Sequence, residues 1–415
     1  MKRAGPLLFA AALSLTTALV AEPLTAARIA ELRARIRDNF FVPNPLPALD
    51  ANVHRRFAPA PGVAAEAVTY ATELGQRVPA ILYLPDPLPQ GAKVPGFVVV
   101  CGHGGDKYSW YSYFTGVTFA RAGVAVLTYD QAGEGERNSG RKSGTREHDK
   151  LQGDAALARR LCGLMLTDVF QATSYLASRP EVDAARIGAG GYSMGSFVLA
   201  IAAAVEPRLT ACVLAGGGNL GGAGDYWDTS SKTMCQGLPS QSLAFLGDKA
   251  ATLYALHAAR GPTFIWNGRL DLTIVPQKTY EPFFDDLRAR TAALHGGMDG
   301  VFEYGFQDGT GHRPGWLERP AMLWLAHHLG FPNWTAESIR TRPTTHILEW
   351  VEQNHLAADK TYMVELMEGG TRAVGDQVPG YRHEDLSVFS PIEWQQARDR
   401  LTFAAWTEAA RAASQ

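Results

Sequence analysis

Six short runs of consecutive apolar residues are the strongest pattern in this chain of 415 residues. The runs do not alternate between apolar and polar positions, which is typical of strands buried on both faces of a parallel sheet. They occupy residues 96–101, 124–129, 187–190, 211–214, 263–266 and 301–304. Stretches of helical composition separate them, at residues 114–122, 155–178, 196–205, 277–294 and 316–329. We therefore predict an α/β fold with a mostly parallel central sheet covered by helices on both faces.

The parts of the chain on either side of this pattern differ from it. Residues 64–73 and 77–84 are predicted to form the two arms of a β-hairpin that leads into the sheet. Residues 22–63 are expected to be a lead-in helix followed by a proline-rich linker. The main domain then spans residues 64–330, and residues 331–415 form a C-terminal helical extension with helices at 346–354 and 391–413. The extension could be a small cap or a subdomain packed against an edge.

The first residues have the pattern of a secretory signal peptide. Lys2 and Arg3 precede an apolar run at residues 6–20, and small residues follow at Ala21 and Ala26. The run is shorter than the about 20 residues that span a bilayer, so a signal peptide of residues 1–21 is favoured over a membrane anchor. Cleavage anywhere between residues 21 and 27 fits the pattern. We expect a secreted or periplasmic protein without stable membrane insertion.

Composition and charge narrow the possible partners and cofactors. The chain is 46% hydrophobic and 19% charged with a formal net charge of −2, and its sequence has no long basic run that would favour nucleic acid. Of its four cysteines, Cys101 and Cys212 lie in predicted strands and are expected to be buried, unreactive thiols. The pairing of Cys162 and Cys235 stays open. No spacing of histidine, cysteine and acidic residues matches a metal motif, so no metal is predicted.

Candidate chemistry is concentrated at residues 191–195, which read Gly-Tyr-Ser-Met-Gly. This G-x-S-x-G motif lies between the predicted strand at 187–190 and the predicted helix at 196–205, which is the context of a turn that exposes a nucleophilic serine. Such a turn is strained, so its neighbours must be small. Ser193 is therefore the candidate nucleophile, and the backbone N–H of Met194 is a candidate oxyanion donor.

A serine hydroxyl becomes nucleophilic when a base takes its proton and a carboxylate orients that base. In this type of fold the partners follow in the order Ser, Asp or Glu, then His. Asp271 follows the predicted strand at 263–266 and His312 follows the one at 301–304, so both are expected at the sheet edge that presents Ser193. Taken singly, Asp271 could be a helix cap and His312 a surface histidine. Their order and positions favour a Ser193–Asp271–His312 triad.

The loop after the first parallel strand is expected to complete the oxyanion hole. Residues 101–106 read Cys-Gly-His-Gly-Gly-Asp. Histidine–glycine loops at this place supply a backbone N–H, and both Gly104 and Gly105 are candidates for that donor. His103 is also compatible with a purely structural role.

These motifs together resemble the α/β-hydrolase superfamily over about residues 64–330. Residues 129–136 (Tyr-Asp-Gln-Ala-Gly-Glu-Gly-Glu) are similar to the Asp-x-x-Gly-x-Gly turn of many members. Residues 178–188 are similar to the approach to the nucleophile in the dienelactone hydrolase, acetyl xylan esterase and prolyl oligopeptidase branches. The resemblance implies an α/β-hydrolase fold, the Ser193/Asp271/His312 triad, hydrolysis through an acyl-enzyme and no cofactor.

Within the superfamily, predicted export and the position of the catalytic domain near the N-terminus favour the acetyl xylan esterase-like group. The chain is then expected to be a secreted carboxylic ester hydrolase that acts on small-molecule or carbohydrate esters. An exported serine peptidase or amidase is an alternative, because ester and amide hydrolysis use the same machinery. A hydrolase-fold binding protein without catalysis is a second alternative, which the intact triad disfavours.

Two long polar stretches, residues 131–154 and 216–243, follow predicted strands at the edge where sites of open α/β sheets lie. Trp110 and Trp227 are predicted to line a cleft for an apolar group or a sugar. Arg269 is a candidate for binding an acidic substrate, although a salt bridge is its simpler role. His148 and Asp149 could reach the same cleft, although a solvated loop is the simpler interpretation.

Overall fold

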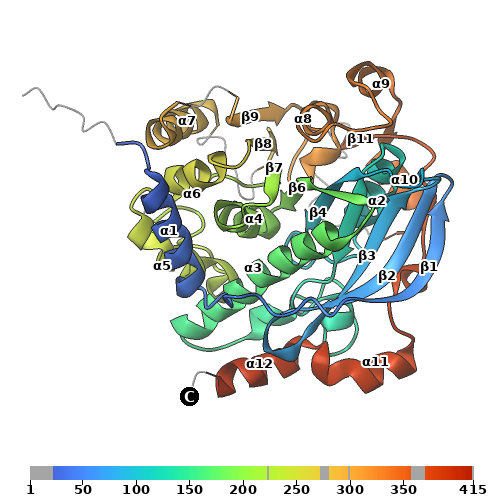
Figure 1. Cartoon of the computed structure of the whole chain (residues 1–415), viewed down its shortest axis with the longest axis horizontal. Helices are drawn as coiled ribbons and strands as arrows, with labels where there is room; N and C mark the ends of the chain where they lie inside the picture. Colours follow the sequence, from blue (N-terminus) through green and yellow to red (C-terminus); the bar gives the residue numbers. More distant parts are fainter. Residues whose placement is uncertain (1–21, 222–223, 272–279, 298–299, 357–369, 414–415) are drawn as a thin grey trace, which may run out of the picture.

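A computed structural model describes residues 22–221, 224–271, 280–297, 300–356 and 370–413, so the predicted signal peptide of residues 1–21 lies outside the described residues. Within them the main sheet has nine strands in the order β1-β2-β3-β5-β4-β6-β7-β8-β9 (Figure 1). The six strands β5-β4-β6-β7-β8-β9 are parallel to their neighbours. The pairs β1–β2, β2–β3 and β3–β5 are antiparallel. The predicted mostly parallel sheet is confirmed.

The observed elements follow the predicted pattern closely. The strands are β1 (Asn52–Ala60), β2 (Val63–Ala71), β3 (Arg77–Pro85), β4 (Val94–Val100), β5 (Ala125–Tyr129), β6 (Val182–Tyr192), β7 (Leu209–Ala215), β8 (Thr263–Gly268), β9 (Phe302–Gln307), β10 (Thr344–His346) and β11 (Arg372–Val374). The α-helices are α1 (Ala26–Asn39), α2 (Trp110–Arg121), α3 (Ala155–Ser178), α4 (Met194–Val205), α5 (Leu238–Ser242), α6 (Lys249–Ala258), α7 (Glu281–His295), α8 (Arg319–Leu329), α9 (Ala336–Thr341), α10 (Ile347–Gln353), α11 (Pro391–Ala397) and α12 (Phe403–Ala412).

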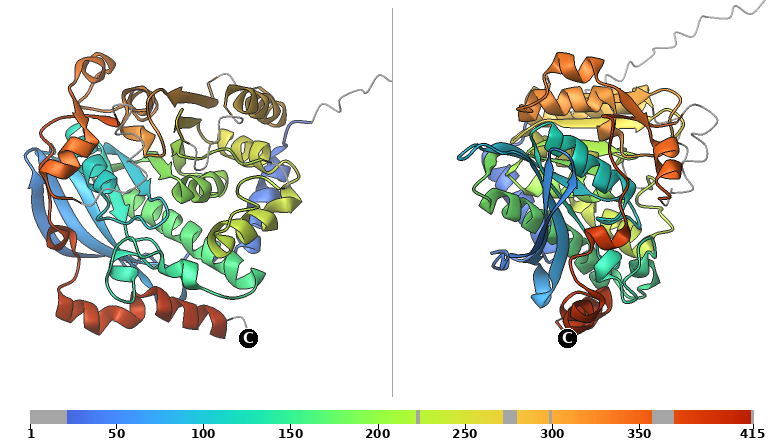
Figure 2. Two further views of the ribbon diagram at one scale, coloured as in Figure 1. Left: turned by 180° about the vertical axis from the view of Figure 1, so that it is seen from behind. Right: turned by 90° about the vertical axis from the view of Figure 1, so that its right-hand side faces the viewer.

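Alternating side chains of the sheet build two hydrophobic layers. On β4, Val98 and Val100 join the layer that contains α1, α3, α4 and α6, whereas Phe97 and Val99 join the layer that contains α2, α8 and α10. Successive side chains of a strand point to opposite faces, so an uninterrupted apolar run is needed to fill both layers. Figures 1 and 2 show the sheet between these two sets of helices.

The order of the strands fixes where a ligand site can lie. β4 continues through α2 to β5, and its neighbour β6 continues through α4 to β7, so the chain leaves these two strands in opposite directions. The two connecting helices also cover opposite faces of the sheet. In open α/β sheets a crevice forms at the carboxyl ends of the strands at such a point. The loops that follow β4 and β6 therefore border the expected site.

One predicted segment is wrong. Residues expected to be part of a linker form β1, an edge strand that pairs with β2 through contacts such as Asn52 with Thr69 and Phe57 with Ala65. Most of its side chains are exposed, so it lacks the continuous apolar run that marks the inner strands. The predicted hairpin arms correspond to β2 and β3, and the predicted lead-in helix corresponds to α1.

The C-terminal extension packs against the main domain in two places. Trp350 and Val388 join the layer on the α2 side, whereas Phe403 and Trp406 join the layer on the α3 side. Figure 1 shows α11 and α12 lying along the lower edge of the molecule, and the single helix predicted at 391–413 is divided at Arg398–Arg400. In the part of the chain described, no helix is both long and apolar enough to cross a membrane.

The contact between α12 and the turn at Glu73–Gly75 makes stability depend on pH. Trp406 Nε1 donates to Glu73 Oε1 at 2.7 Å, and burial raises the pKa of Glu73 to about 7, a shift that this hydrogen bond only reduces. As pH rises from about 4.5 to about 7, the unfolded chain loses this proton first, so the native state is destabilised over that window.

We expect Glu73→Gln to remove this penalty while keeping an acceptor for Trp406. Near pH 8 the variant should be more stable than the wild type, with a free energy of unfolding higher by up to about 3 kcal/mol at ~1.4 kcal/mol for each pKa unit. Near pH 4 it should show no gain. Thermal unfolding at both pH values measures the difference. Glu337→Gln, at an exposed site on α9, is the matched control. An equal gain at both pH values would contradict the assignment.

Candidate active site

Ser193 lies in the sharp turn between β6 and α4. Its φ of 55° and ψ of −119° are a conformation that residues with a side chain rarely adopt, and its N–H donates to the carbonyl of Ala215 at 2.8 Å. A Cβ atom on Gly195 would lie 2.2 Å from the carbonyl oxygen of Val100, and one on Gly191 would lie 2.5 Å from that of Gly195. The two glycines of the motif are therefore required by close backbone contacts, one of which is to the neighbouring strand β4.

Asp271 and His312 form a hydrogen-bonded pair at the same edge of the sheet. His312 Nδ1 lies 2.8 Å from Asp271 Oδ2, and the two residues are 7% and 1% exposed, respectively. A carboxylate only accepts hydrogen bonds, so Nδ1 carries the ring proton and Nε2 is left with its lone pair. The loops after β8 and β9 thus bring together two residues that are 41 positions apart in the chain.

Tyr192 links this pair to the turn at Ser193. Its hydroxyl donates to the carbonyl oxygen of His312 at 3.0 Å, and the two rings have their centroids 4.9 Å apart. Ser193 itself is 8% exposed. Since Tyr192 and Ser193 are adjacent, the three residues predicted as a triad lie in one partly buried region at the carboxyl ends of β6, β8 and β9.

The glycine-rich loop after β4 lies directly against this region. A Cβ atom on Gly102 would come within 2.7 Å of the Tyr192 ring and 3.3 Å of Ser193 Cβ. The Gly102 N–H donates to Tyr111 Oη at 3.1 Å, and the Gly105 N–H donates to the Gly102 carbonyl at 2.8 Å. Gly104 has a φ of +87°, and no described residue accepts a hydrogen bond from its N–H.

Burial makes the Cys101 thiol beside this loop unreactive. Cys101 is buried, and burial raises the pKa of its thiol to about 12, so it stays protonated and does not compete as a nucleophile. Cys101 and Cys212 are both free and buried, as predicted. Cys162 and Cys235, for which pairing was left open, are also free.

The two tryptophans predicted to contact substrate are packing residues. Trp227 is 0% exposed and stacks on Phe197 at 4.9 Å with an interplanar angle of 16°. The prediction that it lines a sugar-binding cleft is wrong, because it has no surface left to offer. Trp110 is 4% exposed and packs edge-on against Tyr111, which in turn holds the glycine-rich loop. The sequence shows their aromatic character but not that both side chains face the core.

Arg269 has the simpler of the two roles considered for it. Its guanidinium makes salt bridges to Glu281 and Asp308, each at 2.8 Å, and its Cζ lies 5.0 Å from the centroid of the Phe306 ring. Two carboxylates already neutralise this cation, so the prediction that Arg269 binds an acidic substrate is corrected to a surface salt bridge.

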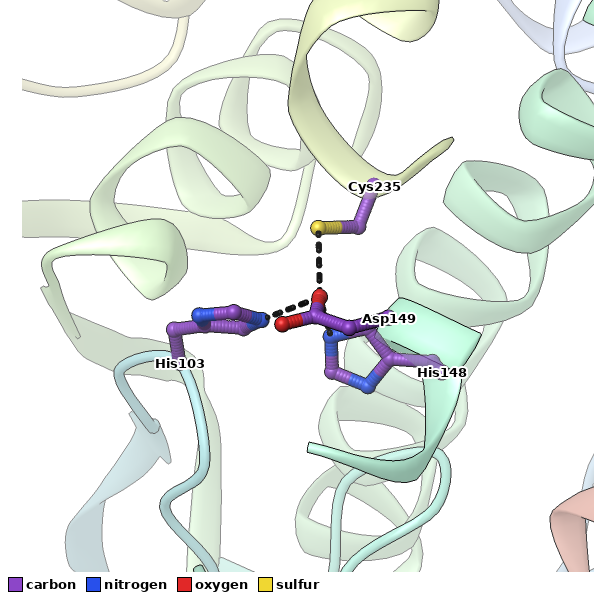
Figure 3. Close-up of side chains that lie close together, drawn as sticks. All are labelled: His103, His148, Asp149 and Cys235. Carbon is purple, nitrogen blue, oxygen red and sulfur yellow. Dashed lines mark hydrogen bonds and ion pairs between the residues drawn. The ribbon is translucent and has the colours of Figure 1, made fainter. Parts of the chain in front are cut away.

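The long loop at residues 131–154 is exposed over much of its second half, but His148 within it faces inward. His148 is fully buried, and burial lowers its pKa to about 4, with the nearby charge of His103 lowering it further. Asp149 Oδ1 lies 2.8 Å from Nε2 of His103, and His103 belongs to the glycine-rich loop (Figure 3). The solvated-loop interpretation is therefore wrong for His148, and His103 has polar partners that sequence spacing could not indicate.

Comparisons with known proteins agree with this architecture. The family model described as acetyl xylan esterase (AXE1) matches residues 47–215, and that of the prolyl oligopeptidase family matches residues 154–331. Among solved structures, the methylesterase BT1017 is similar with a TM-score of 0.59 and 18% identity, over 94% of this chain and 78% of that one. No curated protein matches the chain.

Other esterases among the solved structures are similar at lower scores. An acetyl xylan esterase from Paenibacillus sp. R4 has a TM-score of 0.49 and 16% identity, over 74% of this chain and 97% of that one. A glucuronoyl esterase from Solibacter usitatus has a TM-score of 0.49 and 15% identity, over 70% and 91%.

The fold and the two family matches lead to one classification. The nine-stranded sheet, the serine turn at its switch point and the glycine-rich loop beside it are the parts that α/β-hydrolases use. The two family matches together reach from residue 47 to residue 331, which includes all of these parts. The chain has the α/β-hydrolase fold and is a carboxylic ester hydrolase similar to acetyl xylan esterases.

Proposed function

We propose that this protein is an exported serine esterase that cleaves carboxylic esters, with acetyl esters of carbohydrates as its substrate class. The observation that carries the proposal is the strained turn at Ser193 beside the hydrogen-bonded pair of Asp271 and His312. Backbone strain at a polar side chain persists where the surrounding structure enforces it, and such sites are frequently catalytic. The residues 1–21 that carry the proposed export signal lie outside the described residues.

In the proposed mechanism, His312 acts as the base and Asp271 positions it. His312 Nε2 takes the proton of the Ser193 hydroxyl as Oγ attacks the ester carbonyl, and Asp271 stabilises the imidazolium that forms. His312 then gives the proton to the leaving alcohol, which breaks the ester bond and leaves an acyl group on Ser193. Attack by water, again with His312 as base, releases the acid and restores the serine.

The amide of Met194 and the amide of Gly104 are the proposed oxyanion donors. Met194 is the first residue of α4, so its N–H has no partner inside the helix and lies at the positive end of the helix dipole. Gly104 is favoured over Gly105, because the Gly105 N–H already donates to the Gly102 carbonyl. A donor of this kind is worth about 100- to 1000-fold in turnover.

The match to acetyl xylan esterase supports acetyl groups as the acyl part of the substrate. The match to the prolyl oligopeptidase family spans residues 154–331, the part that contains Ser193, Asp271 and His312. Peptidases and esterases share this machinery, so that match supports the triad more than it supports a peptide substrate. A methylesterase has the same fold, which makes methyl esters a necessary comparison in any test.

Removing the Ser193 hydroxyl tests the proposal. We expect Ser193→Ala to lower kcat/KM for p-nitrophenyl acetate by about 10⁵-fold or more, since a triad without its nucleophile loses nearly all turnover. Ser178→Ala, at the end of α3, is the matched control and should keep wild-type rates. Acetylated oligosaccharides, a methyl-esterified uronic acid and aminoacyl anilides are assayed beside the acetate and butyrate esters.

The panel separates the alternatives. Release of acetate from the oligosaccharides by the wild type alone is the expected result. Equal activity in the wild type and Ser193→Ala would exclude Ser193 as the nucleophile. Faster cleavage of the anilides than of the esters would instead identify a peptidase or amidase, and cleavage of the methyl ester without release of acetate would overturn the acetyl preference.

Asp271→Asn tests the positioning role of the carboxylate. The amide should present an N–H to His312 Nδ1 and favour the tautomer that carries its proton on Nε2, which cannot act as the base. We expect kcat to fall by about 10⁴-fold with KM and the unfolding temperature nearly unchanged. Asp183→Asn, at the opposite end of β6, is the control. A proportional loss of stability and activity would indicate that Asp271 has only a structural role.

A further inference from the structure

Four side chains with metal-binding atoms meet beside the glycine-rich loop: His103, His148, Asp149 and Cys235 (Figure 3). Their ligand atoms all lie within 4.8 Å of one another. His103 belongs to the loop after β4, His148 and Asp149 to the loop after β5, and Cys235 to the loop after β7. Three segments far apart in the sequence therefore bring two imidazoles, a carboxylate and a thiol to one point.

One oxygen of Asp149 is common to the contacts in this cluster. Its Oδ1 lies 2.8 Å from His103 Nε2, 3.7 Å from His148 Nε2 and 3.9 Å from Cys235 Sγ. A tetrahedral zinc site with bonds of ~2.0–2.3 Å separates its ligand atoms by about 3.3–3.8 Å. Two of the three distances are in or next to this range. The third distance, between His103 Nε2 and Asp149 Oδ1, has to increase by about half an ångström to fall within this range.

His148 provides an independent indication of a ligand. Its Nδ1 lies 3.0 Å from the carbonyl oxygen of Ala132, and a carbonyl can only accept, so Nδ1 carries the ring proton and Nε2 keeps its lone pair. This Nε2 atom is buried, is directed toward Asp149 in Figure 3, and has no hydrogen-bond partner among the described residues. A buried acceptor without a donor is costly, and a cation in the cluster satisfies it.

We propose that His103, His148, Asp149 and Cys235 bind one zinc ion. Imidazole nitrogen, thiolate and carboxylate are the ligands that zinc takes in proteins. On binding, the thiol proton of Cys235 leaves to solvent and the ring proton of His103 moves from Nε2 to Nδ1 by exchange with solvent. Bonds from zinc to Sγ, Oδ1 and the two Nε2 atoms then form. The thiolate and the carboxylate together neutralise the charge of the ion.

The surroundings of the cluster favour a structural role over a hydrolytic one. Four protein ligands fill a tetrahedral site and leave no position for a zinc-bound hydroxide. The carbonyl of Ala132 orients His148 from outside the site, and Lys232 Nζ lies 3.2 Å from the second oxygen of Asp149 and orients the carboxylate. The ion thus ties the loop that carries Gly104 to two other loops. Zinc binding itself does not depend on the proposed function, whereas an effect on turnover does.

Cobalt binding to the purified protein tests the proposal directly. After treatment with a chelator, the wild type is titrated with Co²⁺, and we expect one equivalent to produce a thiolate-to-cobalt charge-transfer band that Zn²⁺ abolishes. Zinc should also raise the unfolding temperature, because an ion that binds only the native state stabilises it. Both readouts are independent of esterase activity, so their failure is distinguishable from failure of the proposed function.

Variants identify the ligands. Cys235→Ser should lose the charge-transfer band and bind zinc more than about 100-fold more weakly, since even partners outside the first set of ligands are worth ~10–100-fold. Cys212→Ala removes a buried thiol on β7 outside the cluster and should keep both the band and the stoichiometry. Absence of the band in the wild type, or its persistence in Cys235→Ser, would overturn the proposal. The wild-type titration decides the matter even where a variant fails to fold.

Discussion

The position of the loop beside the proposed active site depends on one buried cation. Lys107, fully buried just after this loop, contacts Asp130 and lies 2.9 Å from Glu136. Burial alone would lower the pKa of Lys107, but the two carboxylates outweigh it and raise the pKa well above its ordinary value. Removing one member of such a group leaves an uncompensated buried charge, at a cost of about 3–5 kcal/mol. The loops after β4 and β5 are therefore held in one arrangement, and this arrangement requires glycine at position 135. A Cβ atom on Gly135 would lie 2.4 Å from the Asp130 carboxylate.

Glu136 also connects the C-terminal extension to the loops beside the proposed active site. Glu136 accepts hydrogen bonds from the backbone N–H groups of Val388 and Phe389, both at 2.9 Å, and Trp394 Nε1 donates to its carbonyl at 2.8 Å. The extension thus supplies donors that a buried carboxylate needs, in addition to apolar side chains for both hydrophobic layers. It makes up a fifth of the chain, and the similarity to the methylesterase BT1017 covers 94% of the chain, so most of the extension has a counterpart in that structure. The extension is accordingly part of the support for the loop that precedes Lys107.

The sequence is informative wherever a short segment determines its own environment. The inner strands need apolar residues at consecutive positions because both faces are covered, and the turn at Ser193 needs glycine on both sides because backbone atoms approach it closely. The edge strand β1 has only one covered side and exposed residues along most of its length, so its pattern did not distinguish it from a linker. The burial of Trp227 and the inward orientation of His148 depend on contacts with distant segments. No spacing within the sequence encodes those contacts.

This difference separates the way the proposed nucleophile is held from the way the loops around it are held. Ser193 is held by backbone contacts of its turn with the neighbouring strands, since its N–H donates to the carbonyl of Ala215 on β7 and the Cβ position of Gly195 in α4 lies against the carbonyl of Val100 on β4. Such contacts depend on glycine alone, and the surrounding side chains can change without moving the nucleophile. The loops that border the site are instead held by side chains, including Lys107 with its carboxylates and the cluster around Asp149. Substitutions in these loops are therefore expected to change turnover, through the position of the Gly104 N–H, as well as which ester reaches Ser193, while the turn at Ser193 stays in place.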